Sequence, residues 1–474
     1  MSAFSEKIKT AINECGVPIA RLAERSGMSA SMLYKIQNGT RLPDSLEALE
    51  QLLDAMLCGL PQRKELLQFY MVERIGVGRY AAFNALKDML ADLADPTPVT
   101  AETSAGKHVL IPPAVTGLEN VNAVVRTVME QETAKEGGEL ALLVPPHYGY
   151  CLETLSQALK DCSPGFRGAH QMFCLRASAT DDALLYNMDV IRRILPKMLM
   201  IEHYDPWYCY LPDPHNGIVP FPFFICTMDC VLLLSGDLES AVYLRDEKIH
   251  DLYLQKCDQM RQNFRPVMQS GSTSLAGYLE MHHWITAESK RPLVPVTMSA
   301  APCIMPCIRR EAIGKYLPDG LITNRDAANL EEYFRNSQKN GYVCFFTVRG
   351  MEYLIEHGHL TEVQGPEIPE IDREDVLDAL EAFIIQAKAG RIVPRIFRQE
   401  IFPASARLCM ALYESKLVTV CEMPKRSAVF LDITEATVSH VLREYAENAL
   451  TLGDVYSPAE SIRIMEDVIR RYRG

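Results

Sequence analysis

Apolar residues recur at helical spacing through the first 56 residues of the chain. Leu22 lies on the inner face of one short helical pattern, and Leu33 and Ile36 form the inner face of the next. Gly27 separates the two patterns, at a place where glycine tolerates a left-handed backbone. Ser29 follows, and its hydroxyl can cap the second helix. We therefore expect two short helices joined by a tight turn, flanked by helices over residues 4–15 and 45–56.

Beyond residue 60 the helical spacing continues, and from residue 109 onward strand and helix patterns alternate. Thr434 is the expected N-cap of one of these helices. No internal repeat of fixed period is visible. Strands and helices mixed in this way indicate an α+β or mixed α/β architecture. The predicted strands are 140–144, 171–175, 207–211, 221–227, 230–235, 241–244, 343–348 and 427–433. The predicted helices are 149–159, 183–199, 247–264, 274–288, 375–389, 435–448 and 458–471.

The two helices and the turn near the N-terminus resemble the helix-turn-helix of the Cro/CI (XRE) family of transcriptional regulators. The resemblance covers residues 4–56 and includes the segment Asn38-Gly39-Thr40-Arg41-Leu42-Pro43 after the second helix. It implies an all-α, lambda-repressor-like domain whose second helix enters the major groove of a double-stranded DNA operator.

The same resemblance implies which side chains contact DNA. It places phosphate contacts at Tyr34, Thr40 and Arg41. The chain departs from the family at Pro18-Ile19, where the family often has a polar residue and a phosphate-binding Gln, and we expect that contact to be lost. The expected base-edge contacts come from Ser29, Ala30, Ser31, Met32 and Lys35.

Charge is distributed unevenly along the chain. Residues 1–80 hold ten basic and nine acidic residues, a net charge of +1, whereas the remainder holds 38 and 52, a net charge of −14. A weakly charged N-terminal region predicts modest non-specific affinity for DNA. We therefore expect a homodimer, in which two copies of the motif bind paired half-sites.

The chain of 474 residues is long enough for several domains, and its 48% hydrophobic composition is ordinary for a globular protein. The segment 95–108, DPTPVTAETSAGKH, predicts a linker. The longest apolar stretch, residues 218–234, contains two prolines and an aspartate and predicts strands rather than a membrane span. The start of the chain lacks a signal peptide's apolar core, so we expect a cytoplasmic protein without membrane contact. The expected domains are a helix-turn-helix DNA-binding domain over 1–60, a helical connector and linker over 61–108, an α/β sensor or dimerisation domain over 109–370, and a C-terminal helical or α+β region over 371–474.

Motifs that carry catalytic chemistry are missing from the sequence. It has no GxxxxGK[ST] phosphate loop, no GxGxxG after a strand, no GxSxG elbow and no HExxH. The pairs Cys226/Cys230 and Cys303/Cys307 could formally supply four thiolates to a metal, although cysteine in such strand-like segments is more often a small core residue. A redox role for these thiols is an alternative. We expect a non-enzymatic chain with no catalytic residue, metal or cofactor.

Residues 221–260 faintly resemble degenerate phospholipase-D-like sensor domains. That family's catalytic signature contains His-x-Lys, which is absent from this chain, so the resemblance implies a non-catalytic scaffold. A weak candidate for ligand binding lies just before it. Trp207, Tyr208 and Tyr210 could form the aromatic wall of a small-molecule pocket. The alternative is that these aromatics alternate as the core of a strand.

Together these patterns favour a sequence-specific DNA-binding transcriptional regulator. Its C-terminal part would dimerise and sense a small-molecule or protein effector by binding it differently in two states. Two alternatives remain open. One is an enzyme or toxin-like effector fused to a DNA-binding motif, and the other is a protein-interaction module that uses a helix-turn-helix fold.

Overall fold

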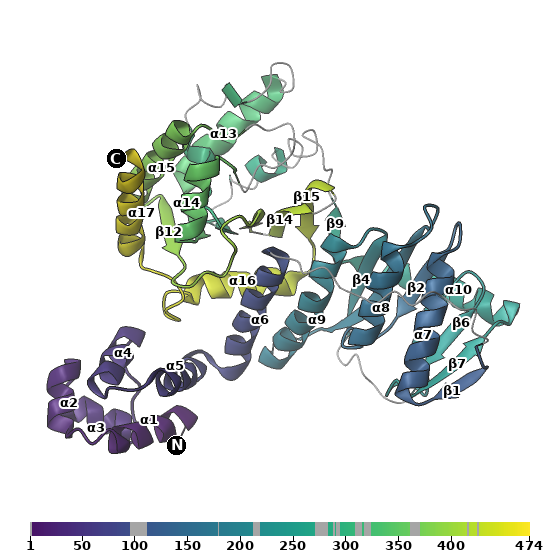
Figure 1. The fold of residues 1–474 in the computed structure, drawn as a ribbon, viewed down its shortest axis with the longest axis horizontal. Coiled ribbons are helices and arrows are strands. Elements are labelled where there is room, and N and C mark those ends of the chain that lie inside the picture. The colour runs from purple at the N-terminus through teal and green to yellow at the C-terminus, as the bar shows by residue number, and fades with distance from the viewer. Residues whose placement is uncertain are drawn as a thin grey trace.

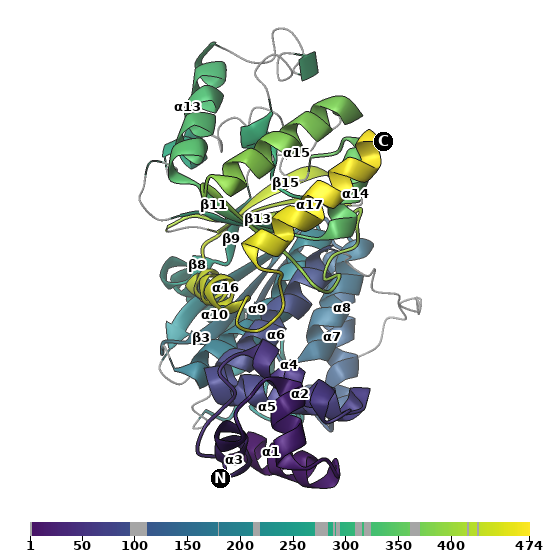
Figure 2. The same ribbon diagram turned by 90° about the vertical axis from the view of Figure 1, so that its left-hand side faces the viewer.

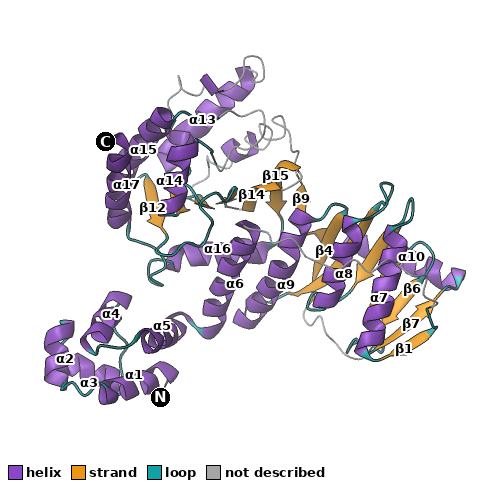
Figure 3. Ribbon diagram, viewed as in Figure 1, coloured by secondary structure: helices purple, strands orange, loops and turns teal. Residues whose placement is uncertain are grey.

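The computed structural model describes residues 2–94, 111–178, 180–211, 219–270, 283–287, 290, 294–308, 315–316, 324–360, 370–414, 417–423 and 426–474. The predicted linker over 95–108 and most of the helix predicted over 274–288 lie outside these residues. The described chain is multidomain and mixed α/β, with an all-helical N-terminal part and two separate sheets (Figures 1 and 3).

The N-terminal helices pack around a small apolar core. Their bounds are α1 Ala3–Glu14, α2 Ile19–Ser26, α3 Ala30–Gln37, α4 Leu46–Ala55 and α5 Leu60–Ile75. Gly27 ends α2 in a left-handed conformation with φ 68°, and the Ser29 hydroxyl accepts a hydrogen bond from the Met32 N–H at the start of α3. Leu22, Leu33 and Ile36 are fully buried, as their spacing predicts.

A long helix, α6 (Val77–Ala94), carries the chain from these helices to the centre of the molecule. There it packs against α9 (Asp181–Met200) and α16 (Ala436–Asn448), as Figure 1 shows. Its Lys87 forms an ion pair of 3.1 Å with Asp454. The N-terminal helices therefore extend away from both sheets at one end of the molecule (Figure 2).

The first sheet, called sheet A, has the strand order β1-β7-β6-β5-β2-β3-β4-β8. Strands β2, β3 and β4 are parallel, and the remaining neighbours are antiparallel. Helices α7, α8 and α9 connect its first strands, and α10 follows β7. The bounds are β1 Ala114–Thr116, α7 Leu118–Thr133, β2 Glu139–Leu143, α8 Gly149–Lys160, β3 Gly168–Arg176, β4 Tyr204–Leu211, β5 Phe223–Cys226, β6 Val231–Leu234, β7 Ser240–Leu244, α10 Glu247–Asn263 and β8 Arg265–Pro266.

The second sheet, called sheet B, has the order β12-β11-β10-β13-β14-β15-β9. Strands β10, β11 and β12 are parallel, and the others are antiparallel. Helices α14, α15 and α17 share a core with one face of this sheet. The bounds are β9 Met268–Ser270, β10 Val296–Ser299, a 3-10 turn Met305–Cys307, α13 Asn324–Asn340, β11 Tyr342–Phe346, α14 Val348–His357, α15 Arg373–Lys388, β12 Ile392–Ile396, β13 Leu408–Leu412, β14 Leu417–Met423, β15 Arg426–Ile433 and α17 Pro458–Arg473.

The two sheets share one topology, which makes the α/β part an internal structural repeat. In each sheet the first strand (β1 or β9) pairs with the seventh in chain order (β7 or β15), and three parallel strands are followed by three antiparallel ones. A helix then follows, α10 or α16, and the chain after it pairs back onto the third parallel strand. That pairing is β8 with β4 in sheet A and a bridge between Val455 and Phe397 in sheet B. The repeat has no counterpart in sequence periodicity.

Most predicted elements are confirmed within two or three residues, among them α9, β4, α15 and α17. The short strands β10, β12, β13 and β14 were not predicted. The N-cap prediction is also wrong by one residue, because Glu435 caps α16 and the Thr434 hydroxyl instead donates to the Pro266 carbonyl, at 2.5 Å. None of the described helices combines the length and the apolar composition that crossing a membrane requires.

Candidate functional site

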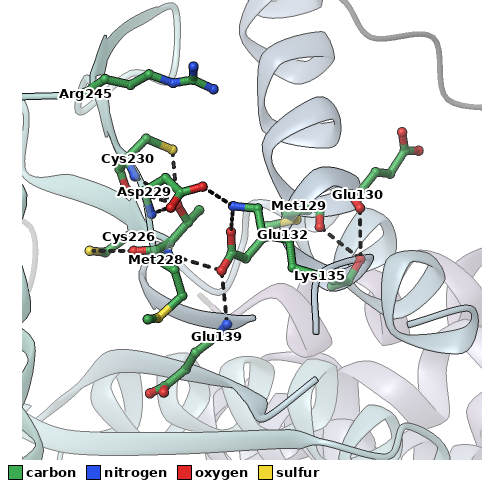
Figure 4. A network of polar contacts seen from close by, with 12 residues as sticks. Met129, Glu130, Glu132, Lys135, Glu139, Cys226, Met228, Asp229, Cys230 and Arg245 are labelled. Atoms are coloured by element: carbon green, nitrogen blue, oxygen red, sulfur yellow. Dashed lines mark hydrogen bonds and ion pairs between the residues drawn. The ribbon is translucent and has the colours of Figure 1, made fainter. Parts of the chain in front are cut away.

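The turn between β5 and β6 carries a network of polar contacts around the sequence Cys226-Thr-Met-Asp-Cys230 (Figure 4). Glu132, at the end of α7, is 1% exposed. Its carboxylate accepts hydrogen bonds from Lys135 Nζ at 2.6 Å and from the N–H groups of Glu139 and Met228, both at 3.1 Å. Because each acceptor has a partner, this buried charge ties α7, β2 and the turn together.

Lys135 bridges the buried carboxylate to the surface, because it also lies 2.5 Å from Asp229. Its ammonium holds the pKa of Asp229 below the usual value. Burial acts to lower the pKa of Lys135, but its hydrogen bonds with Asp229 and Glu132 outweigh burial and raise that pKa. The ion pairs are therefore structural clamps on the turn.

Thr227 organises the turn itself. Its hydroxyl accepts hydrogen bonds from the N–H groups of Asp229 and Cys230, at 3.1 and 3.0 Å. Its carbonyl lies 2.8 Å from His250 Nε2 on α10, which fixes His250 as the donor. Burial raises the pKa of Cys230, and a hydrogen bond with Cys257 together with burial raises that of Cys226. Both cysteines are therefore protonated core residues near neutral pH.

The four thiolates that could formally bind a metal do not meet. Cys226 packs in the core under α10 on sheet A, whereas Cys303 and Cys307 pack in the core between sheet B and its helices. Among the described residues no group of three or more His, Cys, Asp or Glu side chains has a geometry that could hold a metal ion.

The residues that the resemblance assigned to DNA lie on one exposed helix and the turn after it. Ser29, Ala30, Ser31 and Lys35 at α3 are exposed, and Met32 is half-buried. In the group assigned to phosphate, Tyr34 is 53% exposed, and Thr40 and Arg41 are also exposed. Arg41 is paired with Asp44 at 2.9 Å, which neutralises part of the positive charge on this surface.

The three aromatics proposed for a ligand wall do not share a face of β4. Trp207 packs toward α10 and donates from Nε1 to Asp205 at 2.6 Å, whereas the buried Tyr208 belongs to the central core on the opposite face. Tyr208 donates to the Thr434 carbonyl at 3.2 Å, and Tyr210 donates to Glu435 at 2.5 Å. The two tyrosines thus join sheet A to the start of α16.

Glu435 is the centre of this junction and was missed at the sequence level. It is fully buried, and its carboxylate accepts hydrogen bonds from the Thr437 and Val438 N–H groups, the Thr437 hydroxyl and Tyr210. Asn187 on α9 adds a contact of 3.3 Å to the Thr437 hydroxyl. A glutamate just before a helix was the available signal, since acidic side chains favour helix N-termini.

A small cavity lies at the start of β10 and β11 in sheet B. Its volume is about 20 Å³, which admits a water molecule rather than an organic ligand. Its lining includes Thr297, Tyr333, Asn336, Ser337 and Tyr342.

The turn between α4 and α5 exposes two leucines. Leu57 and Leu60 are 78% and 82% exposed. The α4 helix ends in a Schellman motif, with the Cys58 N–H bonded to the Leu53 carbonyl and the Leu57 N–H to that of Asp54. Leu57 occupies the left-handed position of this motif, with φ 55°, where glycine is usual.

Comparison with known proteins gives little similarity. No family model matches the chain, and no curated protein matches it. One solved structure that matches is phosphatidylserine synthase from Haemophilus influenzae Rd KW20, with a TM-score of 0.26 and 8% sequence identity. The match covers 82% of this chain and 98% of that chain. At this TM-score it transfers neither a fold nor an activity to the chain.

The expectation of a sequence-specific DNA-binding transcriptional regulator or repressor is corrected by this comparison. No family model and no curated protein matches the chain, so no comparison supports a DNA-binding regulator, and the solved structure reported above is a synthase. The charge of the chain agrees with the correction. Residues 1–80 carry a net charge of only +1 beside −14 on the remainder, so little positive charge is available to neutralise phosphates.

Proposed function

We propose that the chain is a non-enzymatic protein-interaction module, in which N-terminal helices of helix-turn-helix type dock a partner protein. The docking element is the pair Leu57 and Leu60, which we call the leucine knob. The two α/β halves form the folded body that carries it.

The observation that carries this proposal is the conformation of Leu57. A left-handed backbone costs a residue other than glycine roughly 1–2 kcal/mol. A side chain that is 78% exposed offsets almost none of that cost by packing within the chain. The Schellman motif needs a left-handed residue at this position, but glycine would meet that need without strain, so the fold does not require a leucine here. A strained and exposed leucine is most readily explained by contact with an apolar surface.

The surroundings of the leucine knob specify the chemistry of the partner. Arg63 on α5 pairs with Asp54 and lies 3.9 Å from Glu50, so charges of both signs border the two leucines. An apolar centre bordered by mutually paired charges is the usual anatomy of a protein–protein contact. The partner is therefore expected to present an apolar pocket with a polar rim.

The arrangement of the preceding helices supports a helix-turn-helix fold. The helices α2 and α3 meet at Gly27 and Ser29 caps α3. The helix α2 packs against α4, and α3 packs against α1. A net charge of +1 over residues 1–80 suits docking to a protein, because such docking does not depend on neutralising phosphates.

The experiment compares the full-length chain with the double variant Leu57→Gly/Leu60→Ser. Each protein is used as bait in cells of its own source, captured proteins are quantified by mass spectrometry, and each candidate is then purified and titrated directly. Loss of an interface hot spot worth about 2 kcal/mol weakens binding roughly 30-fold. The control is Leu252→Ser, which removes a leucine that is 64% exposed on α10.

A purified partner that binds the wild type and Leu252→Ser equally, and the double variant at least tenfold more weakly, supports the proposal. If every captured protein binds the double variant as tightly as the wild type, the leucine knob is not the docking element and the proposal fails.

A further inference from the structure

Two cysteines face each other on neighbouring parallel strands of sheet A. Cys174 on β3 and Cys209 on β4 are directly paired in register, and their Sγ atoms are 3.7 Å apart. Directly paired residues on adjacent strands have backbones about 4.8 Å apart, within the Cα separation that a disulfide accepts. The sulfurs thus need only rotate about their Cα–Cβ bonds to reach bonding distance.

The two thiols differ in pKa, and both are partly exposed to solvent. Both side chains are half-buried, so small oxidants can reach them from solvent. The hydrogen bond between the two thiols lowers the pKa of Cys209, and the same hydrogen bond together with burial raises the pKa of Cys174. Cys209 therefore has the larger thiolate fraction, and the Cys174 sulfur, 3.7 Å away, is placed to react second.

A second pair in the same half provides a built-in contrast. Cys226 on β5 and Cys257 on α10 also lie together in one core cluster, but both are only 1% exposed. Oxidation of cysteine follows thiolate character and exposure together. The exposed fraction therefore separates the two pairs, although each has two adjacent sulfurs.

We propose that Cys174 and Cys209 form a modification site for hydroperoxides, which convert the pair reversibly into a disulfide. The Cys209 thiolate attacks the terminal oxygen of hydrogen peroxide, the O–O bond breaks, and hydroxide leaves, which gives a sulfenic acid. The Cys174 sulfur then attacks the Cys209 sulfur, the S–O bond breaks, and water leaves. In total the two thiols are oxidised by two electrons, and one peroxide is reduced to two waters. A small-molecule dithiol reverses the reaction by thiol–disulfide exchange.

The disulfide would lock the ends of β3 and β4 that reach the junction between the halves. Arg176 lies two residues beyond Cys174, and its backbone N–H and carbonyl are both held by the Asn187 side chain. Asn187 in turn contacts Thr437 at the start of α16. On the other strand, Tyr210 follows Cys209 and donates to Glu435. Oxidation therefore restrains both strands at the ends that contact the start of α16 in the other half of the repeat.

The test treats the reduced full-length protein with one equivalent of hydrogen peroxide and maps peptides by mass spectrometry. The expected product is a peptide cross-link between Cys174 and Cys209 that has lost two hydrogens and disappears on treatment with dithiothreitol. In Cys174→Ser, which removes the resolving sulfur, dimedone should trap a sulfenic acid at Cys209. Because the disulfide closes a loop between the two strands, the oxidised wild type should also melt at a higher temperature than the reduced protein.

The matched control is Cys257→Ser, which disrupts the buried pair and should leave the Cys174–Cys209 cross-link unchanged. The proposal is overturned if the cross-link forms only after unfolding in urea, or if the Cys226–Cys257 pair oxidises first. It is equally overturned if dimedone labels cysteines other than Cys209 in Cys174→Ser.

Discussion

The helices α10 and α16 occupy the same place in the two halves of the repeat but differ in burial. Each follows the seventh strand of its sheet in chain order, β7 or β15, and packs on the antiparallel strands, α10 on β5 and β6 and α16 on β13. Among the described residues of α10 only Cys257 is buried. In α16, by contrast, five residues are buried, because the helix also contacts α6 and α9. The buried residues of α16 are Thr437, Val438, Val441, Leu442 and Tyr445.

This difference teaches that topology alone does not set the role of an element. The helix α16 fills the junction between the halves, so its N-cap Glu435 is buried and held by Tyr210 from sheet A. The equivalent N-cap of α10, Asp246, caps only its own helix through the Ile249 N–H at 3.0 Å. Repeated architecture thus gives one exposed helix and one helix that joins the halves.

The chain's two tryptophans allow each half to be followed separately. Trp207 lies in sheet A, and Trp284 packs edge-on against Tyr413 beside sheet B at a ring distance of 5.5 Å. Single-tryptophan variants therefore report the unfolding of one half each by fluorescence, and all four predictions below use this measurement.

The largest effect is expected for Glu132→Ala in the first half. The change leaves the N–H groups of Glu139 and Met228 without their acceptor and Lys135 without a buried partner. Breaking such a buried pair costs about 3 kcal/mol of unfolding free energy. The denaturant midpoint measured from Trp207 fluorescence should fall, whereas the midpoint measured from Trp284 fluorescence should fall much less.

The control for this variant is Glu130→Ala, an exposed position on the same helix, which should leave both signals unchanged. Equal falls of the two denaturant midpoints in Glu132→Ala would show that the halves unfold as one unit, which would contradict a separate response of the first half.

The next largest effect is expected for Gly350→Ala, which should destabilise the second half instead of the first. A Cβ at Gly350 on α14 would lie 2.0 Å from the Ala300 carbonyl oxygen, which accepts the Thr347 N–H and hydroxyl. Overpacking of this kind costs about 1–3 kcal/mol. The denaturant midpoint measured from Trp284 fluorescence should fall. Gly149→Ala, where a Cβ meets open space, is the control. Wild-type stability in Gly350→Ala would contradict the close packing of α14 on β10.

A smaller effect is expected for Arg473→Ala, which removes an electrostatic clasp between α15 and α17 in the second half. The guanidinium of Arg473 on α17 pairs with Glu374, Asp378 and Glu381 on α15. Because these groups lie at the surface and each is at least partly exposed, the expected loss is about 1 kcal/mol or less, and salt should reduce it. The measurement is Trp284-monitored denaturation at low and high salt, with Arg470→Ala as control. A loss that does not depend on salt would refute an electrostatic clasp.

The smallest expected effect is a pH dependence confined to the first half. Lys135 lowers the folded-state pKa of Asp229, so this ion pair stabilises the fold above the unfolded carboxyl pKa of about 4. The contribution is lost as the pH falls through the lower, folded-state value. Asp229 is 62% exposed, so the contribution is below about 1 kcal/mol. In Asp229→Asn the unfolding free energy followed by Trp207 should depend less on pH in this acidic range. An unchanged pH dependence would show that Asp229 does not contribute to it.

Local pattern was enough to predict several of the long elements, although the helices α7 and α13 were missed. The helix α9 was expected over 183–199 and runs from Asp181 to Met200, because its spacing depends only on neighbours along the chain. The strand β12 escaped prediction because it has only five residues and contains Pro394, which a strand at the edge of a sheet tolerates. The candidate site was predicted less well. The CTMDC cysteines were correctly expected to favour the core, whereas Glu132, which holds their turn, lies 94 residues before Cys226 in sequence, and no local pattern links the two.

The sequence by itself determined where many of the helices and strands form, which residues such as Leu22, Leu33 and Ile36 face a core, and where charge gathers. These properties follow from periodicity and composition within a few turns of chain. Only the tertiary structure decided that the α/β part is a repeat, that Cys174 meets Cys209, that Tyr210 meets Glu435, and that Leu57 is strained and exposed. Each of these depends on the register of distant strands or on a single backbone angle, and both are fixed by the packing of the whole chain rather than by neighbouring residues.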